Sequence, residues 1–203
     1  MMVARFAPVL VCHASRHILV HISSLVGSMA KRDGLMEVQF RRVDNRDHAS
    51  TRKLVDHAFR SQGSEVAAFL DALRADGCIL GEWVAEDVSG PIGHIVFSRV
   101  WLEQKDGNRL EAAMLTPLAV RPDRQRLGIG TQLMEYALRE LELRGETLFF
   151  VLGHRDYYPR VGFRSASAAG VESQWPGNPA FMVRAKSVPE GRLVMPLVIA
   201  EAH

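Results

Sequence analysis

The chain has 203 residues, of which 47% are hydrophobic and 24% charged, so it is long and apolar enough to fold as one domain of ordinary size. Its 25 basic and 23 acidic residues give a formal net charge of +2, and Cys12 and Cys78 are its two cysteines. This composition excludes intrinsic disorder of the whole chain and a disulfide scaffold, and no apolar stretch is long enough to predict a membrane span.

Residues 1–35 carry the excess positive charge. They hold four basic residues and one acidic residue, a net of +3, which leaves 21 basic and 22 acidic residues, a net of −1, for the remainder. The remainder therefore lacks the charge of a nucleic-acid-binding protein. The broken apolar runs of residues 1–35 argue against a secretory signal, and the acid-poor composition of this segment only loosely suggests a transit peptide. We interpret residues 1–35 as a disordered extension or a wrongly assigned start. A chain beginning at Met36 is then expected to fold and act normally, with residues 36–203 as the domain.

The first half of the domain predicts a strand, two helices and a hairpin. Residues 38–43 alternate between apolar and polar, which is typical of a strand. Apolar residues recur at helical spacing over 54–59 and over 66–73. Two apolar segments, 79–85 and 92–101, flank a Ser-Gly-Pro turn and predict a β-hairpin.

The second half predicts a long strand, a strong helix and several shorter elements. The strand covers 110–120, and Pro117 cannot donate to a ladder, so we expect a bulge or an edge there. The helix covers 128–144 and has one continuous apolar face. A short helix or turn is expected at 156–161, with further strands at 147–152, 163–171, 181–185 and 193–199. The order β-α-α-β-β-β-α-β-α-β predicts a mixed α/β domain.

Between the long strand and the strong helix lies a loop that suits an anion. The first turn of a helix offers unpaired N–H groups and the positive end of the helix dipole. Gly128 and Gly130 let a ligand approach the backbone closely, and Arg124 and Arg126 add mobile positive charge. The loop therefore predicts a phosphate or pyrophosphate site.

Three ligand classes compete for this loop. A P-loop needs a Gly-Lys-Ser/Thr ending, and no Lys follows here. The dinucleotide fingerprint Gly-x-Gly-x-x-Gly fails at its third glycine, where Leu133 stands. The third class is an acetyl-CoA-binding element.

Residues 125–130 match the Q/R-x-x-G-x-G/A motif of the GCN5-related N-acetyltransferase (GNAT) superfamily, and the chain resembles its small predicted N-acetyltransferase branch. Residues 116–122 look like the family's bulged fourth strand and its exit. Residues 157–163 look like its signature helix after the fifth strand. The resemblance covers roughly residues 37–185. It implies an acyl-CoA N-acyltransferase fold, with a central, mostly antiparallel sheet splayed at strands four and five and flanked by helices.

The resemblance also implies roles for particular residues. A strand-four N–H, from Leu118 or Val120, would polarise the acyl oxygen. The family's general acid is a Tyr four residues before a Gly-Phe pair, which is Tyr158 here. Acetyl-CoA would be held along Leu118, Ala119 and Val120 and by the loop residues Gln125, Arg126, Leu127, Gly128, Ile129, Gly130 and Thr131.

The implied reaction is acetyl transfer from acetyl-CoA to a primary amine of a small molecule or protein by direct attack in a ternary complex. The base stays open among Glu111, His94 and His154. The alternative is a non-catalytic acyl-CoA-binding or regulatory module. The eight histidines show no paired metal spacing, so no metal is expected. We expect no nucleic-acid or membrane partner, a homodimer as an option through the late strands, and a cytoplasmic location.

Overall fold

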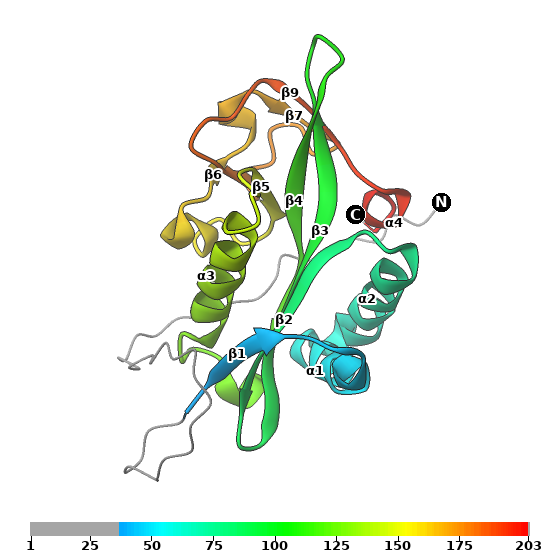
Figure 1. The fold of residues 1–203 in the computed structure, drawn as a ribbon, viewed down its shortest axis with the longest axis vertical. Coiled ribbons are helices and arrows are strands. Elements are labelled where there is room, and N and C mark those ends of the chain that lie inside the picture. Colours follow the sequence, from blue (N-terminus) through cyan, green and yellow to red (C-terminus); the bar gives the residue numbers. More distant parts are fainter. Residues whose placement is uncertain (1–36, 203) are drawn as a thin grey trace.

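The computed structural model describes residues 37–202, so the interpretation of residues 1–35 falls outside the described part of the chain. A nine-stranded sheet forms the centre, in the order β1-β2-β3-β4-β5-β8-β6, with β9 pairing with β3 and β7 with β9 (Figure 1). The strands are β1 (Gln39–Arg42), β2 (Ile79–Asp87), β3 (Gly90–Glu103), β4 (Arg109–Val120), β5 (Phe149–Leu152), β6 (Arg164–Ser165), β7 (Val171–Glu172), β8 (Phe181–Arg184) and β9 (Gly191–Val194). The helices are α1 (His48–Ala58), α2 (Gly63–Asp76), α3 (Ile129–Glu142) and α4 (Leu197–Ala200).

The sheet is mixed. The pairings β4–β5 and β7–β9 are parallel, and the other pairings are antiparallel. This agrees with the expected mostly antiparallel sheet with flanking helices. The elements up to β5 lie where the sequence predicts them, with ends that agree within three residues, except that α1 begins at His48, six residues before the predicted segment 54–59.

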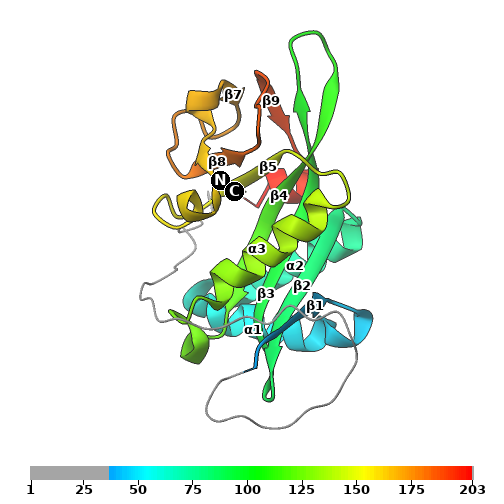
Figure 2. The ribbon, with the colours of Figure 1, turned by 60° about the vertical axis from the view of Figure 1, so that its left-hand side comes forward.

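Helix α3 covers one face of the sheet (Figure 2). It buries a stripe at the spacing of one helical face, which packs on β2, β3 and β4 together with Trp83 and Phe97. The stripe consists of Leu133, Met134, Ala137, Leu138 and Leu141. This packing fixes the N-terminal end of α3 beside the C-terminal end of β4.

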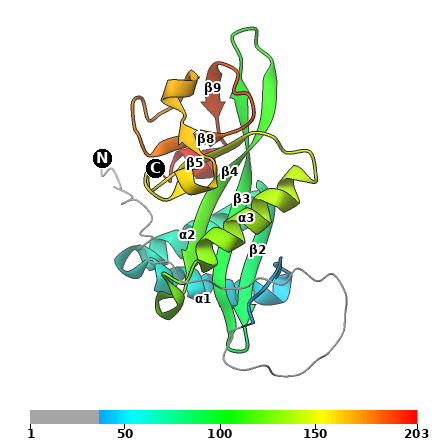
Figure 3. The same cartoon turned by 90° about the vertical axis from the view of Figure 1, so that its left-hand side faces the viewer.

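Helices α1 and α2 cover the opposite face (Figure 3). Leu54 and Val55 of α1 and Leu70 of α2 pack on Val96 and Ala119 of the sheet. Alternate residues of a strand face opposite sides, so β4 presents Ala119 to α1 and α2 and its neighbours Leu118 and Val120 to α3.

The late strands depart from the sequence prediction. The strand expected over 163–171 is interrupted after Ser165 by a 3-10 turn at Ser167–Ala169, and Gly170 reverses the chain in the left-handed region (φ 80°). The strand expected over 193–199 stops at Val194, because Pro196 has no N–H to donate to a ladder and caps the start of α4. Apolar content alone did not distinguish these short elements from strands.

Candidate functional site

Strand β4 leaves its parallel neighbour β5 partway along its length. The two strands pair over two residues of each, ending at Met114 and Phe150. Just beyond, the register between β4 and β3 shifts between Leu115 and Leu118, so β4 holds an extra residue there. The bulge expected at Pro117 is confirmed, and so is the splay of the fourth and fifth strands.

The bulge decides where the last amides of β4 point. The N–H of Arg121 donates to the carbonyl of Ile92 at 2.9 Å. Hydrogen-bonded and non-bonded pairs alternate along an antiparallel ladder, so Leu118 and Val120 turn their N–H groups away from β3. They face the side from which β5 has diverged. Two oriented backbone donors therefore line the splay, and such donors can stabilise negative charge on an oxygen.

The loop after β4 brings the start of α3 against these amides. Arg126 (φ 66°) and Gly128 (φ 80°) both lie in the left-handed region and turn the chain into the helix. The first bond within α3 runs from the N–H of Gln132 to the carbonyl of Gly128 at 3.1 Å. The amides of residues 129–131 precede that bond, so they have no acceptor within the helix. This is the anion-binding geometry that the sequence predicts.

The two glycines of the loop serve different purposes. Gly128 is needed for its left-handed conformation. Gly130 has no positive φ, but a Cβ there would lie 2.9 Å from the hydroxyl of Tyr157 and 3.3 Å from Cγ2 of Val120. Gly130 therefore allows α3 to pack closely against β4. Gln125 adds a side-chain link, because its amide donates to the carbonyl of Val120 at 3.0 Å.

The two arginines from which mobile charge was expected, Arg124 and Arg126, differ from each other. Arg124 is not a mobile charge: its guanidinium is bound by Asp87 at 3.2 Å and by Asp123 at 3.0 Å. Arg121 also contacts Asp123, at 2.7 Å. Arg126 is exposed and forms no ion pair with any residue from 37 to 202. Arg126 is therefore the arginine of this loop that remains available to an anion.

Tyr158 follows β5 and enters the core on the α3 face. Its side chain is fully buried against Tyr157 and Phe163. A Cβ on Gly153 would lie 2.5 Å from its ring, so that glycine makes room for it. Its hydroxyl has no hydrogen-bond partner among the described residues, and burial raises its pKa above the ordinary value. Tyr158 therefore stays protonated, and its hydroxyl is available to donate a hydrogen bond.

The neighbouring Tyr157 is engaged within the protein. It accepts a hydrogen bond from the hydroxyl of Thr131 at 3.3 Å, and burial raises its pKa to about 12. This contact ties the turn that carries both tyrosines to the first turn of α3. Tyr157 is part of the core on the α3 face, and no pattern in the sequence predicts its link to Thr131.

The three residues considered as bases lie in different surroundings. Glu111 is exposed on the part of β4 before the bulge and pairs with Arg99 at 3.2 Å. His154 follows β5, and burial lowers its pKa; its Nε2 is enclosed without a described partner. His94 is fully buried on β3 and opposes Ala119 of β4.

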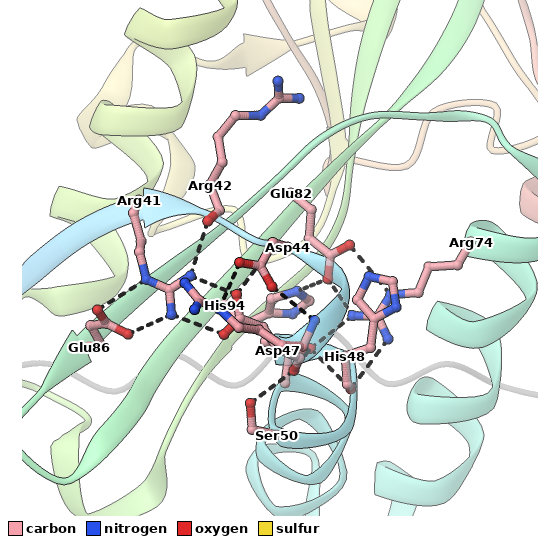
Figure 4. A network of polar contacts seen from close by, with 12 residues as sticks. Arg41, Arg42, Asp44, Asp47, His48, Ser50, Arg74, Glu82, Glu86 and His94 are labelled. Carbon is pink, nitrogen blue, oxygen red and sulfur yellow. Dashed lines mark hydrogen bonds and ion pairs between the residues drawn. The ribbon is translucent and has the colours of Figure 1, made fainter.

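A network of charged side chains ties the sheet to α1 and α2 (Figure 4). His94 contacts Glu82 at 2.7 Å, and Arg74 of α2 also binds Glu82. Nearby, Arg41 binds Asp47 at 2.6 Å and Glu86 at 2.7 Å. These pairs join residues far apart in the sequence.

The network predicts sensitivity to acid. Hydrogen bonds from Arg41 lower the pKa of Asp47 to about 2, from an ordinary value of 3.8. Burial alone would raise the pKa of Glu82, but His94 and Arg74 lower it to about 2. Both pKa values are lowered on folding, so both groups stabilise the fold above their unfolded pKa values. That contribution is lost as pH falls from about 4.5 towards 2.

Urea unfolding between pH 7 and 2 measures this loss. We expect the free energy of unfolding to fall most steeply below pH 4.5. An Arg41→Met variant should flatten part of that slope, because Asp47 would then titrate nearer its ordinary pKa. Arg52→Met is the control, since it removes an exposed ion pair, that with Asp71, and exposed pairs contribute little to stability. Equal slopes in wild type and Arg41→Met would contradict the assignment.

No group of three or more metal-ligating side chains occurs within residues 37–202. In the same part of the chain, none of the helices is long and apolar enough to cross a bilayer.

Comparison with known proteins gives concordant matches. The model of the acetyltransferase (GNAT) domain matches residues 81–165. The uncharacterized N-acetyltransferase YjhQ of Escherichia coli is 32% identical over 126 residues, which is 61% of this chain and 68% of YjhQ.

Two solved structures share the fold. A GNAT family acetyltransferase from Brucella melitensis in complex with acetyl-CoA is 27% identical, with a TM-score of 0.67 over 81% of this chain and 99% of that one. The GNAT family N-acetyltransferase YhbS of Escherichia coli, in complex with CoA, is 26% identical, with a TM-score of 0.74 over 84% of this chain and 96% of that one.

Proposed function

The chain belongs to the GNAT family of acetyltransferases, and from this we propose that it transfers the acetyl group of acetyl-CoA to a primary amine of a small molecule or protein, by direct attack in a ternary complex. The observation that carries the proposal is the splay after Met114, with the amides of Leu118 and Val120 turned into it. The start of α3 and the hydroxyl of Tyr158 lie on the same side of the sheet.

The described residues fit acetyl-CoA on two counts. The amides of residues 129–131 have no acceptor within the helix, which suits a pyrophosphate. The buried hydroxyl of Tyr158 has no partner among residues 37–202, which suits a group that needs a proton. Acetyl-CoA supplies the thioester acyl group, and similar proteins are solved with acetyl-CoA or CoA.

Each residue of the site then has a defined task. Arg126 and the first turn of α3 hold the phosphates. The backbone of Leu118–Val120 aligns the donor like an added strand, and one of its two free amides binds the acyl oxygen. Tyr158 protonates the departing sulfur, and its raised pKa keeps it protonated before each turnover.

A panel of amines tests the proposal directly. Purified protein is mixed with acetyl-CoA and small primary amines or peptides, and the release of free CoA thiol is followed. We expect steady release with at least one amine and none without an acceptor. Binding of acetyl-CoA by calorimetry without release in any mixture would favour the alternative, a non-catalytic acyl-CoA-binding or regulatory module.

Three further statements belong to the proposal. Residues 36–203 form the domain, the protein resides in the cytoplasm, and a homodimer through the late strands is an option. Light scattering of the purified protein tests the dimer, and cell fractionation tests the location.

A further inference from the structure

One ring nitrogen of His94 forms a hydrogen bond and the other does not, and the hydrogen bond determines which nitrogen carries the proton. Nε2 lies 2.7 Å from Oε1 of Glu82. Glu82 is ionised at neutral pH, because His94 and Arg74 lower its pKa to about 2. A carboxylate can only accept, so the proton of this contact sits on Nε2. Nδ1 of the neutral ring therefore carries a lone pair.

That lone pair is enclosed and unused. The side chain of His94 is fully buried, and Nδ1 has no hydrogen-bond partner among the described residues. A buried polar atom without a partner is unfavourable, and the protein accepts that cost here. Nδ1 is thus ready to receive a proton from a group that the chain itself does not supply.

The position of His94 relates it to the splay. It opposes Ala119, which lies between Leu118 and Val120 and forms a hydrogen-bonded pair with it, at a Cα separation of about 5.5 Å. Its side chain lies on the face covered by α1 and α2, beside Arg74 (Figure 4). The α3 face beside the splay is occupied by Tyr157 and Tyr158, whereas His94 lies on the opposite face of the sheet.

We propose that His94, positioned by Glu82 and Arg74, accepts the proton of the attacking amine at Nδ1 through one water. The inference rests on the proposed acetyl transfer. The amine nitrogen forms a bond to the acyl carbon while the carbon–sulfur bond breaks. The electron pair of that bond leaves with sulfur, which takes the proton of Tyr158. The amine proton passes to Nδ1, and the resulting imidazolium is stabilised by Glu82, as in a histidine–carboxylate pair. The imidazolium of His94 then releases its proton to solvent, and solvent returns one proton to Tyr158, so both groups regain their starting states.

The charged groups around His94 set the expected pH dependence. Glu82 of β2 favours the protonated ring, whereas Arg74 of α2, His48 of α1 and burial oppose it. Burial prevails and lowers the pKa of His94 from 6.5. The rate should therefore fall on the acid side with a midpoint below pH 6.5. Deprotonation of the amine substrate adds a separate limb at higher pH, which is the same in all variants.

The test compares the pH profile of kcat/KM for wild type, His94→Gln and Glu82→Gln. The Gln of His94→Gln still donates to Glu82 but cannot take a proton, so we expect turnover to fall on the order of 10²-fold and the acid limb to vanish. Glu82→Gln keeps the imidazole but loses the carboxylate, so the acid limb should move to lower pH. Asp47→Asn is the control, because Asp47 is a buried carboxyl on the same face that does not contact His94. This variant should leave the acid limb of the kcat/KM profile at its wild-type pH.

Two measurements that do not depend on turnover accompany these assays. Nitrogen-15 NMR of the histidine rings should report an Nε2–H tautomer for His94 at pH 7, and calorimetry should give wild-type affinity for acetyl-CoA in both variants. If His94→Gln fails to fold, the proposal is tested by the shift of the acid limb in Glu82→Gln and by the tautomer of His94 in wild type. The assignment is overturned if the acid limb of Glu82→Gln has the same midpoint as that of wild type, or if His94 carries its proton on Nδ1. Absence of CoA release by wild type with every amine overturns the proposed function instead, and this inference with it.

Discussion

Replacing Tyr158 by Phe is expected to lower kcat on the order of 10²–10⁴-fold while leaving the affinity for acetyl-CoA close to that of wild type. Phe keeps the ring that packs against Tyr157 and Phe163, so the fold should survive the change. Only the hydroxyl is removed, and it makes no hydrogen bond with another described residue. The loss should therefore fall on protonation of the leaving sulfur. Steady-state kinetics and calorimetry with acetyl-CoA measure the two quantities separately.

Tyr157→Phe is the matched control for this experiment. It removes a neighbouring hydroxyl of the same chemistry, which is engaged by Thr131 within the protein. Its loss should cost about 0.5–1.5 kcal/mol of stability and leave turnover within a few fold of wild type. If both variants had the same turnover as wild type, Tyr158 would not be the acid. If Tyr157→Phe were the slower variant, the two roles would be exchanged.

The local geometry of the loop and the bulge could be predicted, because it depends on consecutive residues. A strand, a glycine-containing loop and a helix follow one another between Leu118 and Thr131, so their geometry depends on local rules. Pro117 indicated a bulge, because proline has no N–H group to donate to the hydrogen-bond ladder of a sheet. The side towards which Leu118 and Val120 turn their amides required the register with β3, which only the folded sheet provides.

The polar surroundings of the site were less accessible to sequence reasoning. Glu82 and His94 meet across a hairpin, two positions off the paired register, and Arg74 reaches them from a helix. Alternation along a strand placed none of these together. Arg124 was misjudged for the same reason, since its partner Asp87 lies at the end of β2, 37 residues earlier.

The start of α3 yields the second large effect. A Gly128→Val variant is expected to bind acetyl-CoA at least about 10-fold more weakly than wild type. Gly128 has φ 80°, and a side chain in this region costs roughly 1–2 kcal/mol, with β-branched residues disfavoured most. The new Cβ would also lie 3.3 Å from the side-chain amide of Gln132. The loop must then relax, and the amides of residues 129–131 lose their common direction.

Gly107→Val separates the loss of binding from a general loss of stability. Gly107 has φ 84° in the turn between β3 and β4, and a Cβ there would meet no atom within 4 Å. Both variants should lower the free energy of unfolding by similar amounts, because the backbone penalty is the same. Calorimetry should find weaker acetyl-CoA binding only in Gly128→Val, since only that glycine orients amides that have no partner within their helix. Equal affinities in the two variants would mean that the phosphates are held by side chains such as Arg126, and that the turn into α3 serves the fold alone.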